Sequence, residues 1–398
     1  MIAEQYRNML SAKSVIREMS QYATKRGEEI GYENVFDYSL GNPSVPTPDE
    51  FTQSLIRLLQ NEDPVKLHGY SPTLTIPEVR RRTAESLHRR FGIPYTMDDI
   101  FMTAGAAAAI AHAIRAVAVP GDEILTFAPY FPEYSPYIGL AGMTLTVVPA
   151  DVSSFQINFA EFERMLNPKT MAVLINTPNN PSGIVYSTET IRRLADILRR
   201  KQEEFGHDIY IISDEPYREI VFADVDAPCV SAFYENTIVC YSFSKSVSLP
   251  GERIGYIAVN PACRDGKTII QMCGQISRGI GHNCPSSLIQ LGVAEVLDRT
   301  SDLKVYETNM NLIYDELIRL GFSCVKPGGT FYIFPRALEE DAVAFCRKAL
   351  KYDLVLVPGD SFGCPGHFRM AYCIRTEKVE RSLKALRTFV GKEYPNRG

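Results

Sequence analysis

The middle of the chain alternates short apolar runs with longer stretches of helical periodicity, and this alternation restricts the possible folds more than any other feature. Such alternation is typical of a mostly parallel sheet whose two faces are covered by helices. The predicted strands are residues 100–103, 123–127, 145–148, 171–176, 209–213, 238–241 and 255–259. The predicted helices between them are residues 106–118, 160–166 and 190–205. We therefore expect an α/β fold that binds ligands where loops follow the carboxyl ends of the strands.

The two ends of the chain differ from the middle. Residues 5–30 are predicted to be helical, and a proline-punctuated connection follows from Gly41 to Pro48. Beyond about residue 288 there is a long helical pattern, followed by strands at 330–334 and 368–374 and a helix at 377–390. We expect the two ends to form one smaller α+β domain beside the large one. The predicted boundaries are 1–45 with 289–398 for the small domain and 46–288 for the large domain.

Size, charge and cysteine usage exclude several classes of protein. A chain of 398 residues exceeds what one hydrophobic core usually supports, which agrees with two domains. The net charge of -5 offers no basic surface for nucleic acid or for an anionic membrane. No run is apolar and long enough to span a bilayer, and no secretory signal is present at the N-terminus. The nine cysteines show no metal-binding spacing, so we expect reduced thiols, no metal site and a soluble, cytoplasmic protein.

A reactive lysine lies among groups that bind phosphate. Ser242, Ser244 and Lys245 stand together, and Arg253 follows eight positions after the lysine. Hydroxyls and a guanidinium are donors that hold phosphate, and an uncharged lysine amine can form a Schiff base with a carbonyl. Most lysines, however, are solvated surface charges. The cluster indicates a phosphorylated aldehyde cofactor if the rest of the chain supplies the other contacts.

Two polar loops come directly after predicted strands. Asn180 lies in a loop rich in proline and asparagine, which could be a plain turn or could point an amide at a bound ring. Asp214 could cap the segment that follows it. Alternatively, its carboxylate pairs with a pyridinium nitrogen and makes the ring an electron sink. Tyr217 could then donate to the ring oxygen beside the aldehyde.

Three more candidates come from other parts of the chain. Residues Gly105, Ala106 and Ala107 run from a strand into a helix, where backbone N–H groups can approach an anion, although an alanine-rich buried helix would look the same. Phe131 follows another strand and is either a core residue or a stacking face for a planar ligand. Arg369 lies in a strand-like run, where it needs either a salt bridge or a substrate carboxylate as partner.

Together, these residues resemble the fold-type I pyridoxal-phosphate enzymes of the class I/II aminotransferase family. The resemblance covers nearly the whole chain and rests on the order of its residues. That order is Gly41, Tyr70, Gly105, Ala106, Pro129, Phe131, Asn180, Pro181, Gly183, Asp214, Tyr217, Ser242, Ser244, Lys245, Arg253 and Arg369. Each string is common by itself, whereas the complete order is not expected by chance. The resemblance implies a mostly parallel seven-stranded sheet and transfer of an amino group between an L-amino acid and a 2-oxo acid.

The resemblance also implies a role for each residue. Lys245 forms a Schiff base with pyridoxal 5'-phosphate and then moves the proton, while Asp214 pairs with the ring nitrogen. Asn180 and Tyr217 contact the ring oxygen, and Phe131 stacks on the ring. The groups that hold the phosphate are Ser242, Ser244, Arg253 and the amides of Gly105, Ala106 and Ala107. Arg369 binds the α-carboxylate near Gly41, and Tyr70 reaches the phosphate of the partner subunit in a homodimer.

The departures from the family pattern concern the substrate. Thr75 stands where the family usually has glycine, and Ala107 stands where one aspartate-specific branch has a lysine. Arg278 could replace the cross-subunit arginine that another branch uses for dicarboxylates, or it could be an exposed helix-end residue. A carbon–sulfur β-lyase on the same scaffold is the alternative activity, because it needs the same Lys245 and Asp214. A non-enzymatic regulator is not favoured, because every catalytic position is filled.

Overall fold

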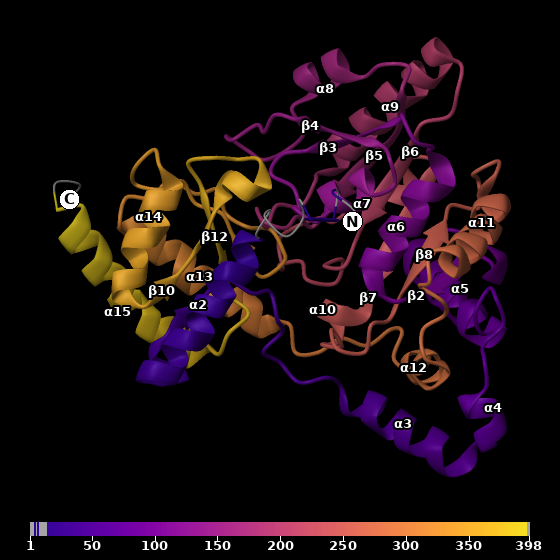
Figure 1. Ribbon diagram of the computed structural model, residues 1–398, viewed down its shortest axis with the longest axis horizontal. Helices are drawn as coiled ribbons and strands as arrows, with labels where there is room; N and C mark the ends of the chain where they lie inside the picture. The colour runs from indigo at the N-terminus through magenta and orange to yellow at the C-terminus, as the bar shows by residue number, and fades with distance from the viewer. Residues whose placement is uncertain (1–3, 5, 8–13, 396–398) are drawn as a thin grey trace.

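The computed structural model describes residue 4, residues 6–7 and residues 14–395, and it consists of two lobes (Figure 1). A seven-stranded sheet forms the centre of the large lobe, in the order β2-β8-β7-β6-β5-β3-β4. Its strands are β2 (Ile100–Thr103), β3 (Glu123–Phe127), β4 (Thr144–Val148), β5 (Thr170–Asn176), β6 (Tyr210–Asp214), β7 (Thr237–Ser242) and β8 (Gly255–Val259). Only β8 runs antiparallel to its neighbours. The mostly parallel sheet expected from the sequence is confirmed.

Successive residues of the central strands pack on opposite faces of the sheet, which explains why the strands are apolar throughout. Ile124 and Leu174 belong to the core on one side, whereas Leu125 and Val173 belong to the core on the other. A strand alternates its side chains between the two faces, so a sheet covered on both sides needs apolar residues at every position.

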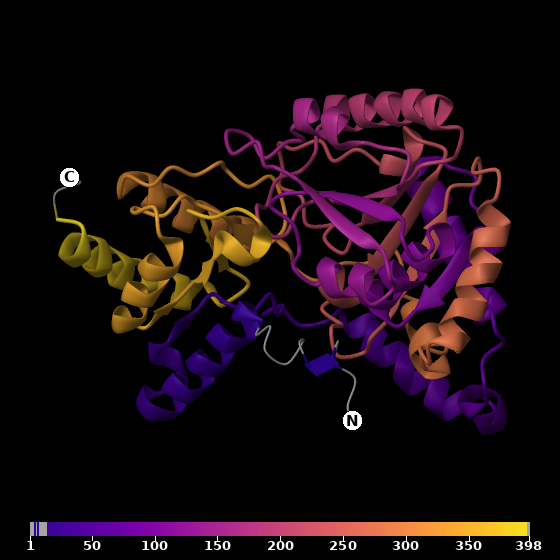
Figure 2. The same cartoon turned by 45° about the horizontal axis from the view of Figure 1, so that its top comes forward.

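Helices cover both faces of the large lobe (Figures 1 and 2). The helices of this lobe are α3 (Asp49–Asn61), α4 (Pro64–His68), α5 (Pro77–Phe91), α6 (Gly105–Val117), α7 (Tyr134–Gly139), α8 (Phe159–Met165), α9 (Thr188–Phe205), α10 (Phe243–Ser246), α11 (Gly266–Gly279) and α12 (Ser287–Val293). Helix α9 shows how local sequence sets the boundaries. The Ser187 side chain accepts from the Thr190 amide at its start, and Gly206 takes a left-handed conformation at its end.

The small lobe brings α2, from the first part of the chain, beside the elements of the last part (Figure 2). Its helices are α2 (Val15–Ile30), α13 (Lys304–Arg319), α14 (Ala342–Ala349) and α15 (Thr376–Glu393), and its strands are β1 (Phe36–Asp37), β9 (Tyr332–Ile333), β10 (Leu354–Val355), β11 (Val357–Pro358) and β12 (Phe368–Ala371). Strand β1 pairs with β10, with Phe36 opposite Leu354. Strands β11, β12 and β9 form an antiparallel sheet.

The predicted elements correspond to observed ones, and their ends shift by a few residues. The helix expected at 5–30 is α2 over its described part, and residues 5 and 8–13 lie outside the described residues. The domain boundary at residue 288 remains a prediction; it falls within α12, which packs on α3 of the large lobe. Thr75 has φ of 72°, a left-handed conformation that favours glycine and explains the family's usual residue there. No helix among the described residues is long and apolar enough to cross a membrane.

Candidate active site

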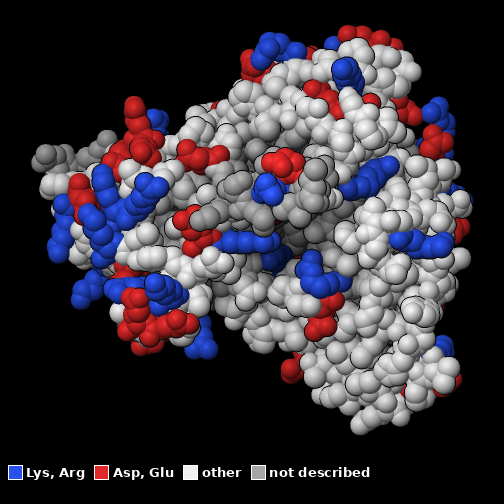
Figure 3. All heavy atoms as spheres, in the orientation of Figure 1, with Lys and Arg blue, Asp and Glu red and all other residues white. Residues whose placement is uncertain are grey.

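A cavity of about 370 Å³ lies between the two lobes, at the carboxyl ends of the parallel strands. Lys and Arg side chains gather around this hollow in the space-filling view (Figure 3). The predicted site residues that line it are Gly41, Ala106, Ala107, Phe131, Asn180, Asp214, Tyr217, Ser242, Ser244, Lys245, Arg253 and Arg369. Residues as far apart in sequence as Gly41 and Arg369 therefore face one space.

Lys245 lies in α10, directly after β7, and its amine is held at the boundary between the lobes. Its Nζ donates to the Gly41 carbonyl oxygen at 2.6 Å. A side chain at Gly41 would bring its β-carbon within 1.9 Å of the Tyr332 hydroxyl oxygen, so only glycine fits there. Burial, with the nearby charges of Arg253 and Arg369, lowers the pKa of Lys245 to about 8, although Cys373 opposes this shift. Lys245 can therefore exist as a neutral nucleophile near neutral pH.

Asp214 ends β6 and is paired in register with Asn176, the last residue of β5. One carboxylate oxygen, Oδ2, accepts from the Tyr134 hydroxyl at 2.6 Å. The other, Oδ1, is buried without a hydrogen-bond partner among the described residues. Burial raises the pKa of Asp214 to about 7, although the Tyr134 hydrogen bond opposes this. An unpartnered carboxylate oxygen in a cavity wall requires a donor from a ligand.

Arg369, in β12, is 1% exposed and lies at another wall of the cavity. Its Nη1 donates to Asn180 Oδ1 at 3.0 Å, and its Nη2 donates to the Ser39 carbonyl oxygen. Its Nε has no partner, and no carboxylate of the described residues lies within ion-pair distance. Burial lowers the pKa of Arg369, although the nearby Tyr332, Tyr217, Cys373 and Asp37 oppose this shift. The geometry thus provides a guanidinium for an anionic ligand.

The remaining donors lie where β2 and β7 end, on either side of the start of β8. Ser242 Oγ and Ser244 Oγ lie 2.7 Å apart, and α6 begins at Gly105 with φ of 80°. A side chain at Gly105 would bring its β-carbon within 2.9 Å of Arg253 Nη2. The start of a helix, two hydroxyls and a guanidinium therefore surround one position, which is the donor set of a phosphate site.

Three predicted site residues do not line the cavity: Gly105, which lies beside Arg253, and Tyr70 and Arg278, which lie elsewhere on the chain. Tyr70 is fully exposed, and Arg278, near the end of α11, is exposed and donates to Gln275 at 3.4 Å. The loop after α11 contacts the Tyr70 loop, because Cys284 Sγ lies 3.4 Å from the Pro72 carbonyl oxygen.

The structure adds residues that sequence reasoning missed. Tyr134 positions Asp214, and Tyr332 places its hydroxyl 3.1 Å from that of Tyr217. Arg17 and Glu133 also line the cavity, from α2 and from the loop before α7. The only local sequence feature that could have pointed to Tyr134 is its position three residues after Phe131. Tyr332, Arg17 and Glu133 show no sequence pattern that distinguishes them from ordinary surface or core residues.

A buried ion network lies beside the site, on the other side of β6 and β7. Arg218 Nε donates to Glu215 Oε2 at 2.6 Å, and Glu215 also accepts from Ser213 at 2.7 Å. The guanidinium of Arg218 lies over the Tyr241 ring at 4.7 Å and donates to the Tyr256 hydroxyl at 3.1 Å. Although burial lowers the pKa of Arg218, its neighbours, Tyr256 and Glu215 foremost, raise it above its ordinary value. These charges are fully paired within the chain.

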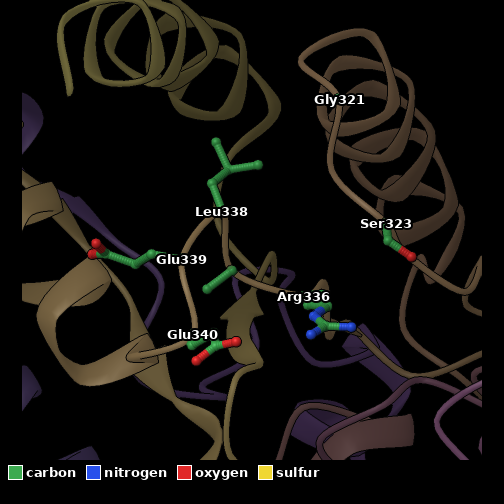
Figure 4. A pocket seen from close by; sticks show the side chains of 7 residues that line it. Gly321, Ser323, Arg336, Leu338, Glu339 and Glu340 are labelled. Atoms are coloured by element: carbon green, nitrogen blue, oxygen red, sulfur yellow. The ribbon is translucent and has the colours of Figure 1, made fainter. Parts of the chain in front are cut away.

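A second cavity, of about 280 Å³, lies in the small lobe, away from these groups (Figure 4). Its charged lining consists of Arg336, Glu339 and Glu340. Glu339 is already paired, because it accepts from Lys348 at 2.6 Å and from the Tyr394 hydroxyl at 3.0 Å. Among the described residues it contains none of the predicted site residues, and we assign it no role.

Comparisons with known proteins agree with this geometry. Residues 33–386 match the model of the family described as aminotransferase class I and II. The chain is 31% identical over 364 residues to an aspartate aminotransferase of Thermotoga maritima, covering 90% of this chain and 92% of that protein. It is 30% identical over 372 residues to aromatic-amino-acid aminotransferase 2 of Thermococcus litoralis, covering 89% and 91%. A solved amino transferase from Eubacterium rectale is similar with a TM-score of 0.96 and 42% identity over 99% of each chain.

Proposed function

This chain belongs to the class I and II aminotransferase family and is an aminotransferase, and from that premise we propose how its cavity works. We propose that it moves an amino group between an L-amino acid and a 2-oxo acid, with pyridoxal 5'-phosphate as cofactor. The relatives named above are aminotransferases, so the carbon–sulfur lyase is not favoured. All nine cysteines are free, in keeping with the cytoplasmic location that we also propose.

The cavity fits that cofactor at both of its polar ends. Ser242, Ser244, Arg253 and the amides at the start of α6 would hold the phosphate. At the other end, the unpartnered Oδ1 of Asp214 would accept from a protonated ring nitrogen, whose charge would bring the pKa of Asp214 back down. Tyr217 and Asn180 would contact the ring oxygen, and Phe131 would cover the ring face. When bound, the cofactor supplies the electron sink that makes the proton on an amino-acid α-carbon removable.

Lys245 is the group that we propose moves this proton, after holding the cofactor covalently through Nζ. A base with a pKa of about 8 is partly neutral at cellular pH and returns a proton readily. The Gly41 carbonyl fixes the position of Nζ at 2.6 Å. A positioned amine that both removes and returns the proton would contribute to the rate as a general base and then as a general acid.

The observation that carries the proposal is the buried, anion-free guanidinium of Arg369 in the cavity that contains Lys245. A buried unpaired charge costs several kcal/mol, so an evolved protein retains it where a ligand completes the pair. An amino-acid α-carboxylate matches the two-pronged shape of the guanidinium. It would place the α-carbon between Arg369 and Lys245.

We further propose a homodimer with shared sites. Exposed apolar side chains lie on α3, on α4 and in the loop after α4, with Leu59, Val65 and Tyr70 between 54% and 106% exposed. A second copy of the chain that packs against α3, α4 and the loop after α4 would bring its Tyr70 toward the phosphate and its Arg278 toward the substrate. Neither contact exists within one chain.

The test is a half-reaction screen. The purified protein is loaded with pyridoxal 5'-phosphate, mixed with each amino acid, and followed by its visible absorbance. We expect true substrates to bleach the band, and we expect Lys245→Ala to show neither the pH-sensitive band nor turnover. Release of pyruvate without an oxo-acid acceptor would instead support the lyase.

A further inference from the structure

Two tyrosine hydroxyls face each other in the wall of the central cavity. Tyr217 follows β6 of the large lobe, Tyr332 begins β9 of the small lobe, and their hydroxyl oxygens lie 3.1 Å apart. Both side chains are buried, and among the described residues neither hydroxyl has another hydrogen-bond partner. Resting on the proposed function, in which Tyr217 contacts the ring oxygen of the cofactor, we propose that Tyr332 is a positioning residue that donates its hydroxyl proton to Tyr217.

The direction of this hydrogen bond follows from counting protons. A tyrosine hydroxyl has one proton to donate and can also accept through its oxygen. If Tyr217 donated to Tyr332, its proton would not be available to the cofactor. Burial raises the pKa of Tyr332 to about 12, although Arg369 opposes this shift. Tyr332 therefore keeps its proton at neutral pH and can donate it to Tyr217, whose own proton is then free for the ring oxygen.

The Tyr332 side chain is held in place by several neighbours. Its backbone pairs with Ala371 of β12, and its amide donates to Thr330 Oγ1 at 3.0 Å. Its ring packs against the Arg369 guanidinium, whose central carbon lies 4.7 Å from the ring centroid. Gly41 packs against the hydroxyl itself, because a β-carbon there would come within 1.9 Å of the hydroxyl oxygen. So close a fit keeps the hydroxyl within reach of Tyr217.

A donor to Tyr217 changes how Tyr217 acts on the cofactor. A hydroxyl that accepts a hydrogen bond becomes a stronger donor in turn. Donation to the ring oxygen withdraws negative charge that would otherwise stabilise a protonated nitrogen at the bond to Lys245. Loss of either hydroxyl should therefore raise the pH at which the visible absorbance of the loaded protein changes. The effect of Tyr332 should be the smaller one, because it acts through Tyr217.

The test is a spectrophotometric pH titration of the protein loaded with pyridoxal 5'-phosphate. We expect Tyr217→Phe to raise the midpoint by about one pH unit. Tyr332→Phe should raise it by about 0.3 unit. The double variant should match Tyr217→Phe alone, because the proposal gives Tyr332 no other route to the cofactor. Phenylalanine keeps the ring that packs against Arg369, so the change is confined to the hydroxyl.

Tyr306→Phe is the matched control. Tyr306 is a buried tyrosine of the same lobe that packs on Phe331 at 5.2 Å and does not line the cavity, so this change should leave the midpoint unaltered.

The inference is overturned if Tyr332→Phe has the wild-type midpoint, if Tyr306→Phe moves the midpoint equally, or if the double variant shows the sum of the two single shifts. An unchanged midpoint in Tyr217→Phe would remove the contact through which Tyr332 acts and would overturn it too. A wild-type protein with no pH-sensitive visible band would instead refute the proposed function, and the two failures are therefore distinguishable.

Discussion

Two buried arginines, Arg218 and Arg369, differ in what neutralises them. Arg218 is held by Glu215 at 2.6 Å and by the faces and hydroxyls of neighbouring tyrosines. Arg369 is more deeply buried, yet its contacts are an amide oxygen, a backbone carbonyl and the rings of Tyr332 and Phe362 at 4.7 and 5.0 Å. The charge of Arg218 is neutralised within the chain, whereas Arg369 forms no ion pair among the described residues and is available to a ligand.

This difference separates a structural charge from a functional one. A buried ion pair contributes little net stability, but losing one partner leaves the other as an unpaired buried charge. Arg218 should therefore matter for folding. Arg369 forms no ion pair among the described residues, so its removal would leave no carboxylate unpaired. Its removal should therefore affect binding and leave folding intact.

The largest expected effect is on catalysis in Arg369→Met. Loss of the carboxylate partner should lower kcat/KM by about a thousandfold, which corresponds to about 4 kcal/mol. The free energy of unfolding of the cofactor-free protein should stay the same or rise, because an unpaired buried charge is removed. Steady-state kinetics with denaturant unfolding on the same samples checks both. A comparable loss of stability would mean that Arg369 is a structural residue.

The second effect is on folding in Arg218→Met. Glu215 would be left buried without its cation, and the free energy of unfolding should fall by about 3 kcal/mol. Denaturant unfolding measures this change. The double variant Arg218→Met/Glu215→Met is the control, since removing both charges should restore most of the loss. A double variant as unstable as the single one would contradict the paired-charge explanation.

The third effect is on the titration of Lys245. Only the neutral amine attacks the cofactor aldehyde, so attachment to the cofactor-free protein should speed up as pH rises through about 8 and level off above it. Arg369 contributes to the lowered pKa, so Arg369→Met should move this midpoint upward by less than about one unit. Stopped-flow absorbance across pH measures it. A shift of equal size in Arg218→Met would remove the distinction between the two arginines.

The smallest effect is expected at an arginine that is paired but exposed. Arg81, on α5, forms ion pairs with Glu78 at 2.6 Å and with Glu85, and it is about half exposed. Water already solvates these charges, so Arg81→Met should leave both the denaturant midpoint and turnover unchanged. A clear loss of stability would show that pairing by itself, and not burial, determines the cost of removing a paired arginine.

Much of the fold and the candidate site could be predicted from local patterns. The strands could be predicted because residues buried on both sides of a sheet must be apolar at successive positions. The loops of Asn180, Asp214 and Lys245 could be placed at one edge, because parallel strands end together. Tyr134 could not be found, because it acts through Asp214, which is 80 positions away in sequence.

The chemistry available to this protein can be seen in local segments of its sequence: a lysine, a carboxylate, phosphate donors and a strand arginine. Which charges meet depends instead on how those segments pack. Packing placed Glu215 against Arg218, left Arg369 with no anion, and brought Arg17 to the cavity across more than two hundred positions from Lys245. The reason is that neutralisation and burial depend on distances in space, which are set when both lobes fold together.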